Sequence, residues 1–115
     1  MAGQESSGTG LMADIRPVNA RCEANFTLVF NIENIGVGIA DGQVDYKVTT
    51  LDTGTSAIPV TKTDFTQVHL SPGETSSEIV HNNSGCNVQF TNVDLLLQPR
   101  FLDSNSANNS VSFSN

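Results

Sequence analysis

The stretch ANFTLVFNIENIG, residues 24–36, decides the fold class. Large apolar side chains occupy every second position from Phe26 to Ile32, and polar side chains occupy most of the positions between them. A period of two is typical of a β-strand with one face against a core, and Val29, which breaks the polar series, indicates partial cover on the other face too. We predict that four side chains of this strand point inward together: Phe26, Leu28, Phe30 and Ile32. Their expected partners are Val44, Tyr46, Val48, Val93, Leu95 and Leu97.

Further segments of this kind lie on both sides of that strand. Residues 13–18 predict a first strand, which Pro17 places at a sheet edge because proline cannot donate a ladder hydrogen bond. The alternating apolar residues stand at even positions up to Phe90 and at odd positions from Val93 on. One extra residue in a β-bulge would produce that change. The other strands are expected at residues 43–50, at 58–70 as one or two short strands with Phe65, Val68 and Leu70 buried, and at 75–80, 88–98 and 110–113. About seven strands predict an all-β fold, a two-sheet β-sandwich.

Turn signals separate these strands. Ser71-Pro72-Gly73-Glu74 is the most specific, since proline presets φ at the second turn position and glycine accepts a positive φ at the third. Residues 35–42 predict a Gly-rich loop, residues 51–56 a turn, and residues 81–87 a second loop.

The first residues of the chain and its composition limit the classes of protein that it can belong to. Residues 1–13 lack the basic and apolar regions of a signal peptide, so we expect a flexible linker or an artificial remnant there, followed by one domain over residues 14–115. If the protein is secreted, its signal peptide lies upstream. Apolar residues make up 37% and charged residues 15%, and the formal net charge is −7 with five Lys and Arg. A basic stripe and an apolar run of about 18 residues are both missing from the sequence, so we expect neither nucleic-acid binding nor membrane insertion.

The two cysteines, Cys22 and Cys86, fall in predicted connections between strands. If the strands alternate up and down, those two connections lie at the same end of the sandwich, so a disulfide between them is geometrically reasonable. Closing so long a loop would stabilise the fold by roughly 4 kcal/mol in the chain-entropy model. We therefore predict a Cys22–Cys86 disulfide and an extracytoplasmic protein, against the alternative of two free thiols in a cytosolic one.

Residues that carry catalytic or metal chemistry are few. His69 and His81 do not stand at a metal-ligand spacing, and no nucleophile signature is present, so we expect no catalytic residue, no metal ligand and no cofactor. In the C-terminal loop, Asp103, Asn105 and Asn109 offer oxygen atoms that suit calcium. A dedicated calcium loop contains more carboxylates and a glycine at its bend. We therefore predict that residues 103–110 form an ion-free connection whose Asn side chains cap local backbone groups.

Three sequence blocks together resemble a known family. They are NIENIGVGIADGQVDYKV (residues 31–48), HLSPGETSS (residues 69–77) and VDLLLQPRFLDSNSANNSVSFS (residues 93–114). In their order and spacing they resemble the cell-adhesion-related domain found in bacteria, CARDB. The matching residues are Asn34, Gly36, Ala40, Leu70, Pro72, Gly73, Glu74, Val93, Asp94, Asn108 and Asn109. Where the family often carries E-x-N-E before its final Asn pair, this chain has Asp103-Ser-Asn-Ser-Ala.

The resemblance implies an immunoglobulin-like or fibronectin-III-like sandwich in a secreted or surface protein of a prokaryote, without catalysis. Our first functional hypothesis is a structural or adhesive module, whose partners are neighbouring domains of a longer chain and a protein or carbohydrate at the cell surface. The alternative is a carbohydrate-binding accessory domain of a secreted polysaccharide-degrading enzyme. Sugar platforms usually present Trp or Tyr. This chain has no Trp, one Tyr in a buried-looking register (Tyr46), and Phe65, Phe90 and Phe101 as other candidates.

Overall fold

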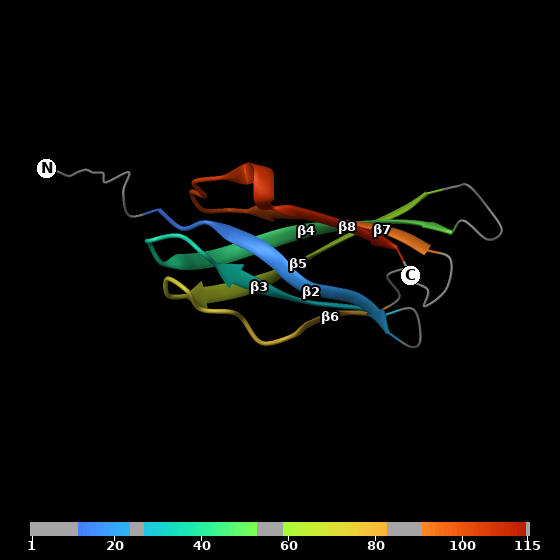
Figure 1. Cartoon of the computed structure of the whole chain (residues 1–115), viewed down its shortest axis with the longest axis horizontal. Helices are drawn as coiled ribbons and strands as arrows, with labels where there is room; N and C mark the ends of the chain where they lie inside the picture. The colour runs from blue at the N-terminus through green and yellow to red at the C-terminus, as the bar shows by residue number, and fades with distance from the viewer. Residues whose placement is uncertain (1–11, 24–26, 53–58, 83–90, 115) are drawn as a thin grey trace, which may run out of the picture.

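Seven strands in the part of the chain that the structure describes form two antiparallel sheets that pack face to face, as the computed structural model shows (Figure 1). The structure describes residues 12–23, 27–52, 59–82 and 91–114. One sheet has the order β2-β3-β6, with β2 at Ile15–Glu23, β3 at Thr27–Asn34 and β6 at Ile79–His81. The other has the order β5-β4-β7-β8, with β5 at Val60–Leu70, β4 at Ala40–Asp52, β7 at Thr91–Pro99 and β8 at Ser110–Ser114. The predicted all-β sandwich of about seven strands is confirmed.

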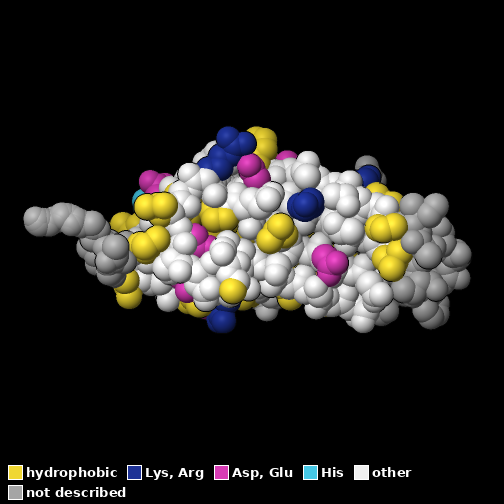
Figure 2. All heavy atoms as spheres, turned by 90° about the horizontal axis from the view of Figure 1, so that it is seen from above, with side chains coloured by type: hydrophobic (Ala, Val, Ile, Leu, Met, Phe, Trp, Pro, Cys, Tyr) yellow, Lys and Arg dark blue, Asp and Glu magenta, His cyan; other side chains and the backbone are white. Residues whose placement is uncertain are grey.

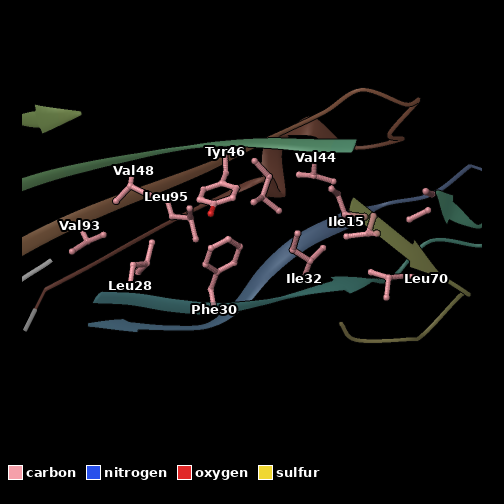
Figure 3. Packing of buried hydrophobic residues seen from close by; sticks show 14 residues of the cluster. Ile15, Leu28, Phe30, Ile32, Val44, Tyr46, Val48, Leu70, Val93 and Leu95 are labelled. Atoms are coloured by element: carbon pink, nitrogen blue, oxygen red, sulfur yellow. The ribbon is translucent and has the colours of Figure 1, made fainter. Parts of the chain in front are cut away.

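The core fills the space between the sheets (Figure 3). Phe30 from β3 stands edge-on to Tyr46 from β4, with ring centroids 5.1 Å apart and an interplanar angle of 76°. Such edge-to-face pairs are favourable because the positive edge of one ring meets the negative face of the other. The other buried apolar residues of this cluster are Ala13, Ile15, Leu28, Ile32, Ala40, Val44, Val48, Val68, Leu70, Val93, Leu95 and Leu97.

The central strand β3 has the predicted faces. Leu28, Phe30 and Ile32 are fully buried, and all six of their expected partners belong to the same cluster. Phe26, the fourth residue predicted to point inward, lies outside the described residues. Val29 is also buried although it faces the other way, so β3 is covered on both sides, as predicted.

Strand β2 is an edge strand, as Pro17 predicts, but it is longer than expected. Its register against β3 shifts by one residue between Val18 and Arg21, and Asn19 in that interval has a positive φ of 57°. This is a β-bulge, and the extra residue moves the inward-facing set from Ile15 and Pro17 to Ala20 and Cys22. Cys22 therefore lies inside a strand and not in a connection, which corrects its predicted position.

Strands β4 and β5 are both longer than predicted. The Gly-rich segment 35–42 was expected to be a loop throughout, yet β4 already begins at Ala40 and continues to Asp52. Residues 60–70 form one continuous strand, because β5 pairs with β4 at every position from Ala40↔Leu70 to Thr50↔Val60. In this register Val68 and Leu70 are buried as predicted. The prediction for Phe65 is wrong: it faces outward and is 57% exposed, since it lies opposite Asp45 and not opposite a core residue.

The turn at Ser71–Glu74 is confirmed. Gly73 has a φ of 84°, and the backbone N–H of Glu74 donates to the carbonyl of Ser71 at 3.0 Å. The strand predicted at residues 75–80 is reduced to an isolated bridge, Glu33↔Thr75, followed by the short β6.

At the C-terminal end, β8 alternates as predicted, with Val111 and Phe113 packed against the core. β7 keeps an unbroken register with β4 from Thr91 to Pro99. The bulge predicted between Phe90 and Val93 cannot be placed, because Phe90 lies outside the described residues.

The burial of Phe30 gives a stability prediction with an internal control. Phe30→Ala removes a fully buried ring from the centre of the core, so the free energy of unfolding should fall by about 3 to 5 kcal/mol in urea titrations. The matched variant Phe65→Ala removes the same group from an exposed position and should change it by less than about 0.5 kcal/mol. Equal losses for the two variants would contradict the assignment of inner and outer faces.

Candidate functional site at the proximal pole

The three sequence blocks meet at one end of the sandwich. We call this end, where β2 begins, the proximal pole, and the end where β8 finishes the distal pole. The proximal pole consists of residues 12–15, the loop 35–39, the turn 71–74 and the loop 100–109, and it lies on the left in Figure 1.

A buried asparagine connects three of these segments. Asn34, the last residue of β3, is fully buried, and its side-chain oxygen accepts hydrogen bonds from the N–H groups of Asp14 (3.1 Å) and Gly36 (3.0 Å). Its side-chain nitrogen donates to the carbonyls of Gly38 (2.8 Å) and Leu70 (3.0 Å). The amide thus satisfies four backbone groups that β-ladders do not pair, which is the condition for burying a polar side chain without a large cost.

Gly36 and the turn lie against the same asparagine. A Cβ atom on Gly36 would approach Asp14 N to 2.5 Å and Met12 O to 2.6 Å, so only glycine fits between the loop and the start of β2. Gly73 N donates to Asn34 O at 2.7 Å, and Asn34 N donates to Glu74 O at 2.9 Å. Four of the residues that suggested the family resemblance, Asn34, Gly36, Gly73 and Glu74, therefore have a structural role at the proximal pole.

Met12, the first residue that the structure describes, is already part of this pole. The Met12 carbonyl accepts hydrogen bonds from Val37 N (3.2 Å) and Gly38 N (3.0 Å), and Ala13 is buried and bridges to Asp103. Met12 and Ala13, which the sequence analysis grouped with a linker, are therefore hydrogen-bonded into this pole.

The C-terminal loop combines one local cap with contacts to the start of β2. Asn105 caps the short 3-10 helix η2 (Ser106–Asn108) by accepting a hydrogen bond from Ala107 N at 3.1 Å, as predicted for an Asn side chain here. Asp103 Oδ1 accepts from Ile15 N at 3.2 Å, and Asn108 Nδ2 donates to Asp14 Oδ1 at 2.9 Å. Asp103 and Asn108, two of the loop residues that the sequence analysis singles out, thus contact the start of β2.

Three oxygen atoms of this loop are buried without a hydrogen-bond partner: Asp103 Oδ2, Asn108 Oδ1 and Asn109 Oδ1. Asn109 is 4% exposed, and it lies at the same hollow as Asp103 and Ser106. The prediction that the Asn side chains satisfy local backbone groups is correct for Asn105 and wrong for Asn108 and Asn109. No cluster of three or more His, Cys, Asp or Glu side chains that could hold a metal ion occurs within the described ranges.

A second polar cluster joins the two sheets at their β5 and β6 edges. His81 from β6 is 7% exposed, and its Nδ1 lies 3.3 Å from the hydroxyl of Tyr46 in β4 and 3.7 Å from Oδ2 of Asp64 in β5. Burial, with a contribution from Asp64, raises the pKa of Tyr46 to about 12. Burial lowers the pKa of His81, and Asp64 opposes that shift in part. The neutral imidazole and phenol therefore form a polar contact across the core. His69 is exposed and lies 3.3 Å from Asp41.

Of the two cysteines in the predicted disulfide, only Cys22 lies within the described residues. Cys22 is opposite Leu28, and Leu28 is opposite His81, so Cys22 lies at the same end of its sheet as the start of the connection that contains Cys86. Cys86 lies outside the described residues, and the Cys22–Cys86 disulfide stays a prediction.

The surface has one exposed aromatic ring within the described part of the chain, that of Phe65. Phe101 is partly buried against the core, and Phe90 lies outside the described residues. Figure 2 shows one face of the molecule, on which basic and acidic side chains are scattered among uncharged ones. No helix in the described part of the chain is long and apolar enough to cross a membrane.

Comparisons with known proteins do not assign the chain to a group. No family model matches the sequence, and no curated protein matches it. The resemblance to the CARDB family therefore stays a prediction that depends on the three sequence blocks.

The role of Asn34 can be measured directly. Asn34→Ala leaves two N–H groups and two carbonyls at the proximal pole without their partner, so the free energy of unfolding should fall by at least about 3 kcal/mol. Asn92→Ala is the control, because Asn92 is exposed on β7, and it should change stability by less than about 0.5 kcal/mol in the same urea titrations. A small effect of Asn34→Ala would mean that the four bonds do not hold the pole together.

The buried His81 predicts a loss of stability in mild acid. Its folded-state pKa lies below the ordinary value of 6.5, so the unfolded chain takes up a proton first as the pH falls. This contribution to stability is complete above pH about 6.5 and is lost progressively below it. Urea midpoints measured between pH 7.5 and 5 should fall with pH, and the fall should be smaller in His81→Gln. The exposed His69→Gln is the control and should keep the wild-type slope; identical slopes in all three proteins would refute the assignment.

Proposed function

We propose that the chain is a non-catalytic β-sandwich module of a secreted or surface prokaryotic protein, in which it acts as a rigid spacer or in adhesion through protein contacts. The observation that carries the proposal is the path of the chain. β2 begins at the proximal pole and β8 ends at the distal pole of a body that measures 57 × 23 × 18 Å (Figure 1). Domains joined before β2 and after β8 would therefore lie at opposite ends of an elongated unit.

Two features of the structure support a spacer. Pairing between β4 and β5 extends over eleven consecutive residue pairs, and β7 pairs along the other side of β4, so the long axis is braced by a continuous ladder. The proximal pole is also fixed by Asn34 and Gly36, as described above. A module that holds two domains at a fixed separation has to resist bending both along its body and at its junctions.

The proximal pole also offers apolar surface for a neighbouring domain. Ile35, Val37 and Ile39 are 41%, 62% and 57% exposed, and they lie in the loop beside Met12. Apolar surface grouped at a chain junction fits a contact with the preceding domain of a longer chain. The predicted Cys22–Cys86 disulfide agrees with an oxidising location outside the cytoplasm.

The spacer proposal can be tested by small-angle X-ray scattering of tandem proteins. Two and three copies of residues 12–114, joined by short linkers, should increase the maximum dimension by about 57 Å per copy. The control joins the copies by flexible Gly/Ser linkers of about 20 residues, which should give a broad distance distribution. Tandem proteins with short linkers that collapse to the dimensions of the control would contradict a rigid spacer.

A carbohydrate-binding module is the second candidate, and the exposed ring of Phe65 is the observation that favours it. The ring lies on the outer face of the four-stranded sheet and borders a hollow that Gln43, Asp45 and Arg100 also line. Gln43 and Arg100 both donate to the Asp45 carboxylate, at 2.7 and 2.9 Å, and these contacts lower its pKa. An apolar ring beside such polar groups suits a sugar ring. Retardation in polysaccharide gels that Phe65→Ala abolishes would favour this candidate over the spacer.

A further inference from the structure

The unpaired oxygen atoms of the C-terminal loop have one chemical feature in common. Asp103 Oδ2, Asn108 Oδ1 and Asn109 Oδ1 are all hydrogen-bond acceptors, and all three are buried. Buried acceptors without a partner are costly and uncommon, and three in seven residues require an explanation. The partner that these acceptors lack is either a hydrogen-bond donor or a cation.

The orientation of the Asn108 amide is determined by its neighbour. Its Nδ2 donates to the carboxylate oxygen of Asp14 at 2.9 Å. Turning the amide over would place Oδ1 against that carboxylate, where two acceptors repel each other. The unpaired oxygen of Asn108 is therefore a property of the site and not an arbitrary choice of rotamer.

Two of the three side chains reach the same part of the molecule. Asn108 contacts Asp14 and Asp103 contacts the next residue, Ile15, so both side chains reach β2 at adjacent positions. Asp103 and Asn109 line one hollow, which Ser106 also borders. Asn109 is held in place by its backbone, because its carbonyl accepts from Leu97 N at 2.8 Å and its N–H donates to Ser106 O at 3.3 Å.

We propose that the proximal pole binds one calcium ion through Asp103 Oδ2, Asn108 Oδ1 and Asn109 Oδ1. Carboxylate and amide oxygens are the ligands that calcium prefers, and it completes its shell of six to eight with carbonyls and water. The carboxylates of Asp103 and Asp14 supply two negative charges at this end of the chain, enough to balance a divalent cation. The proposal reverses the ion-free reading of residues 103–110, which counted one carboxylate because Asp14 is distant in sequence.

The expected affinity is low. One carboxylate ligand, two amide ligands and no glycine at the bend place the site with extracellular modules, whose dissociation constants lie at about 10⁻⁴ to 10⁻³ M. Binding would link β2 to the loop before β8. An ion there would stiffen the pole at which a preceding domain joins.

The test is thermal unfolding with direct binding measured beside it. After treatment with chelator, the whole protein is melted in about 150 mM NaCl with chelator or with about 5 mM CaCl₂, and the heat of calcium binding is measured by calorimetric titration. We expect calcium to raise the melting temperature by several degrees, as one site occupied well above its dissociation constant does in a domain of this size. No rise and no binding heat would overturn the proposal and leave ordered water as the partner of these oxygens.

Three variants locate the ion. Asp103→Asn keeps an acceptor for Ile15 N but removes the charged ligand, so the calcium-dependent rise should disappear. Asp41→Asn makes the same charge change at an exposed side chain and should keep the rise. Asn109→Asp adds a carboxylate to the site, so it should be less stable in chelator and show a larger calcium-dependent rise than the wild type. An undiminished rise in Asp103→Asn, or no calcium response in Asn109→Asp, would overturn the proposed site.

Discussion

The fully buried side chain of Asn34 is the contact on which the proximal pole depends. Its two atoms satisfy four backbone groups from the start of β2, the loop 35–39 and the end of β5, which come from both sheets. Backbone groups at the end of a sandwich have no strand partner, and leaving them buried and unpaired would destabilise the fold. One amide solves this problem because it carries both a donor group and an acceptor group. Gly36 then follows as a consequence, since the loop must pass within contact distance of Met12 and Asp14.

Within the described part of the domain, the buried polar side chains discussed above are of three kinds. Asn34 is fully hydrogen-bonded and therefore structural. Tyr46 and His81 are paired with each other across the sheets and are kept neutral by burial, so their contact is sensitive to pH. Asn109 is buried with its side-chain oxygen unpaired, and this difference is the basis of the calcium site proposed for the C-terminal loop.

The elongated form has a simple origin in strand length. β4 has 13 residues and β5 has 11, and they pair without a break, so the four-stranded sheet extends well beyond the three residues of β6. The seven described strands alternate in direction along this axis, so β2 begins and β8 ends at opposite poles (Figure 1). The proposed spacer role rests on this path, whereas the proposed roles in adhesion or sugar binding rest on surface groups such as Phe65.

The sequence by itself determined the fold class, the face of β3 and the turn at Ser71–Glu74, because period-two burial and the φ demands of Pro and Gly are local properties. It also indicated which residues at the proximal pole matter, though not why. Only the tertiary structure decided that Phe65 faces outward, since the register of β5 depends on its partner strand, and that Cys22 lies inside β2, since the bulge at Asn19 shifts the pairing. The polar network at the proximal pole could not be predicted from the sequence either. Asp14 and Asn108 are 94 positions apart, and only the way in which the two sheets pack brings their side chains into contact.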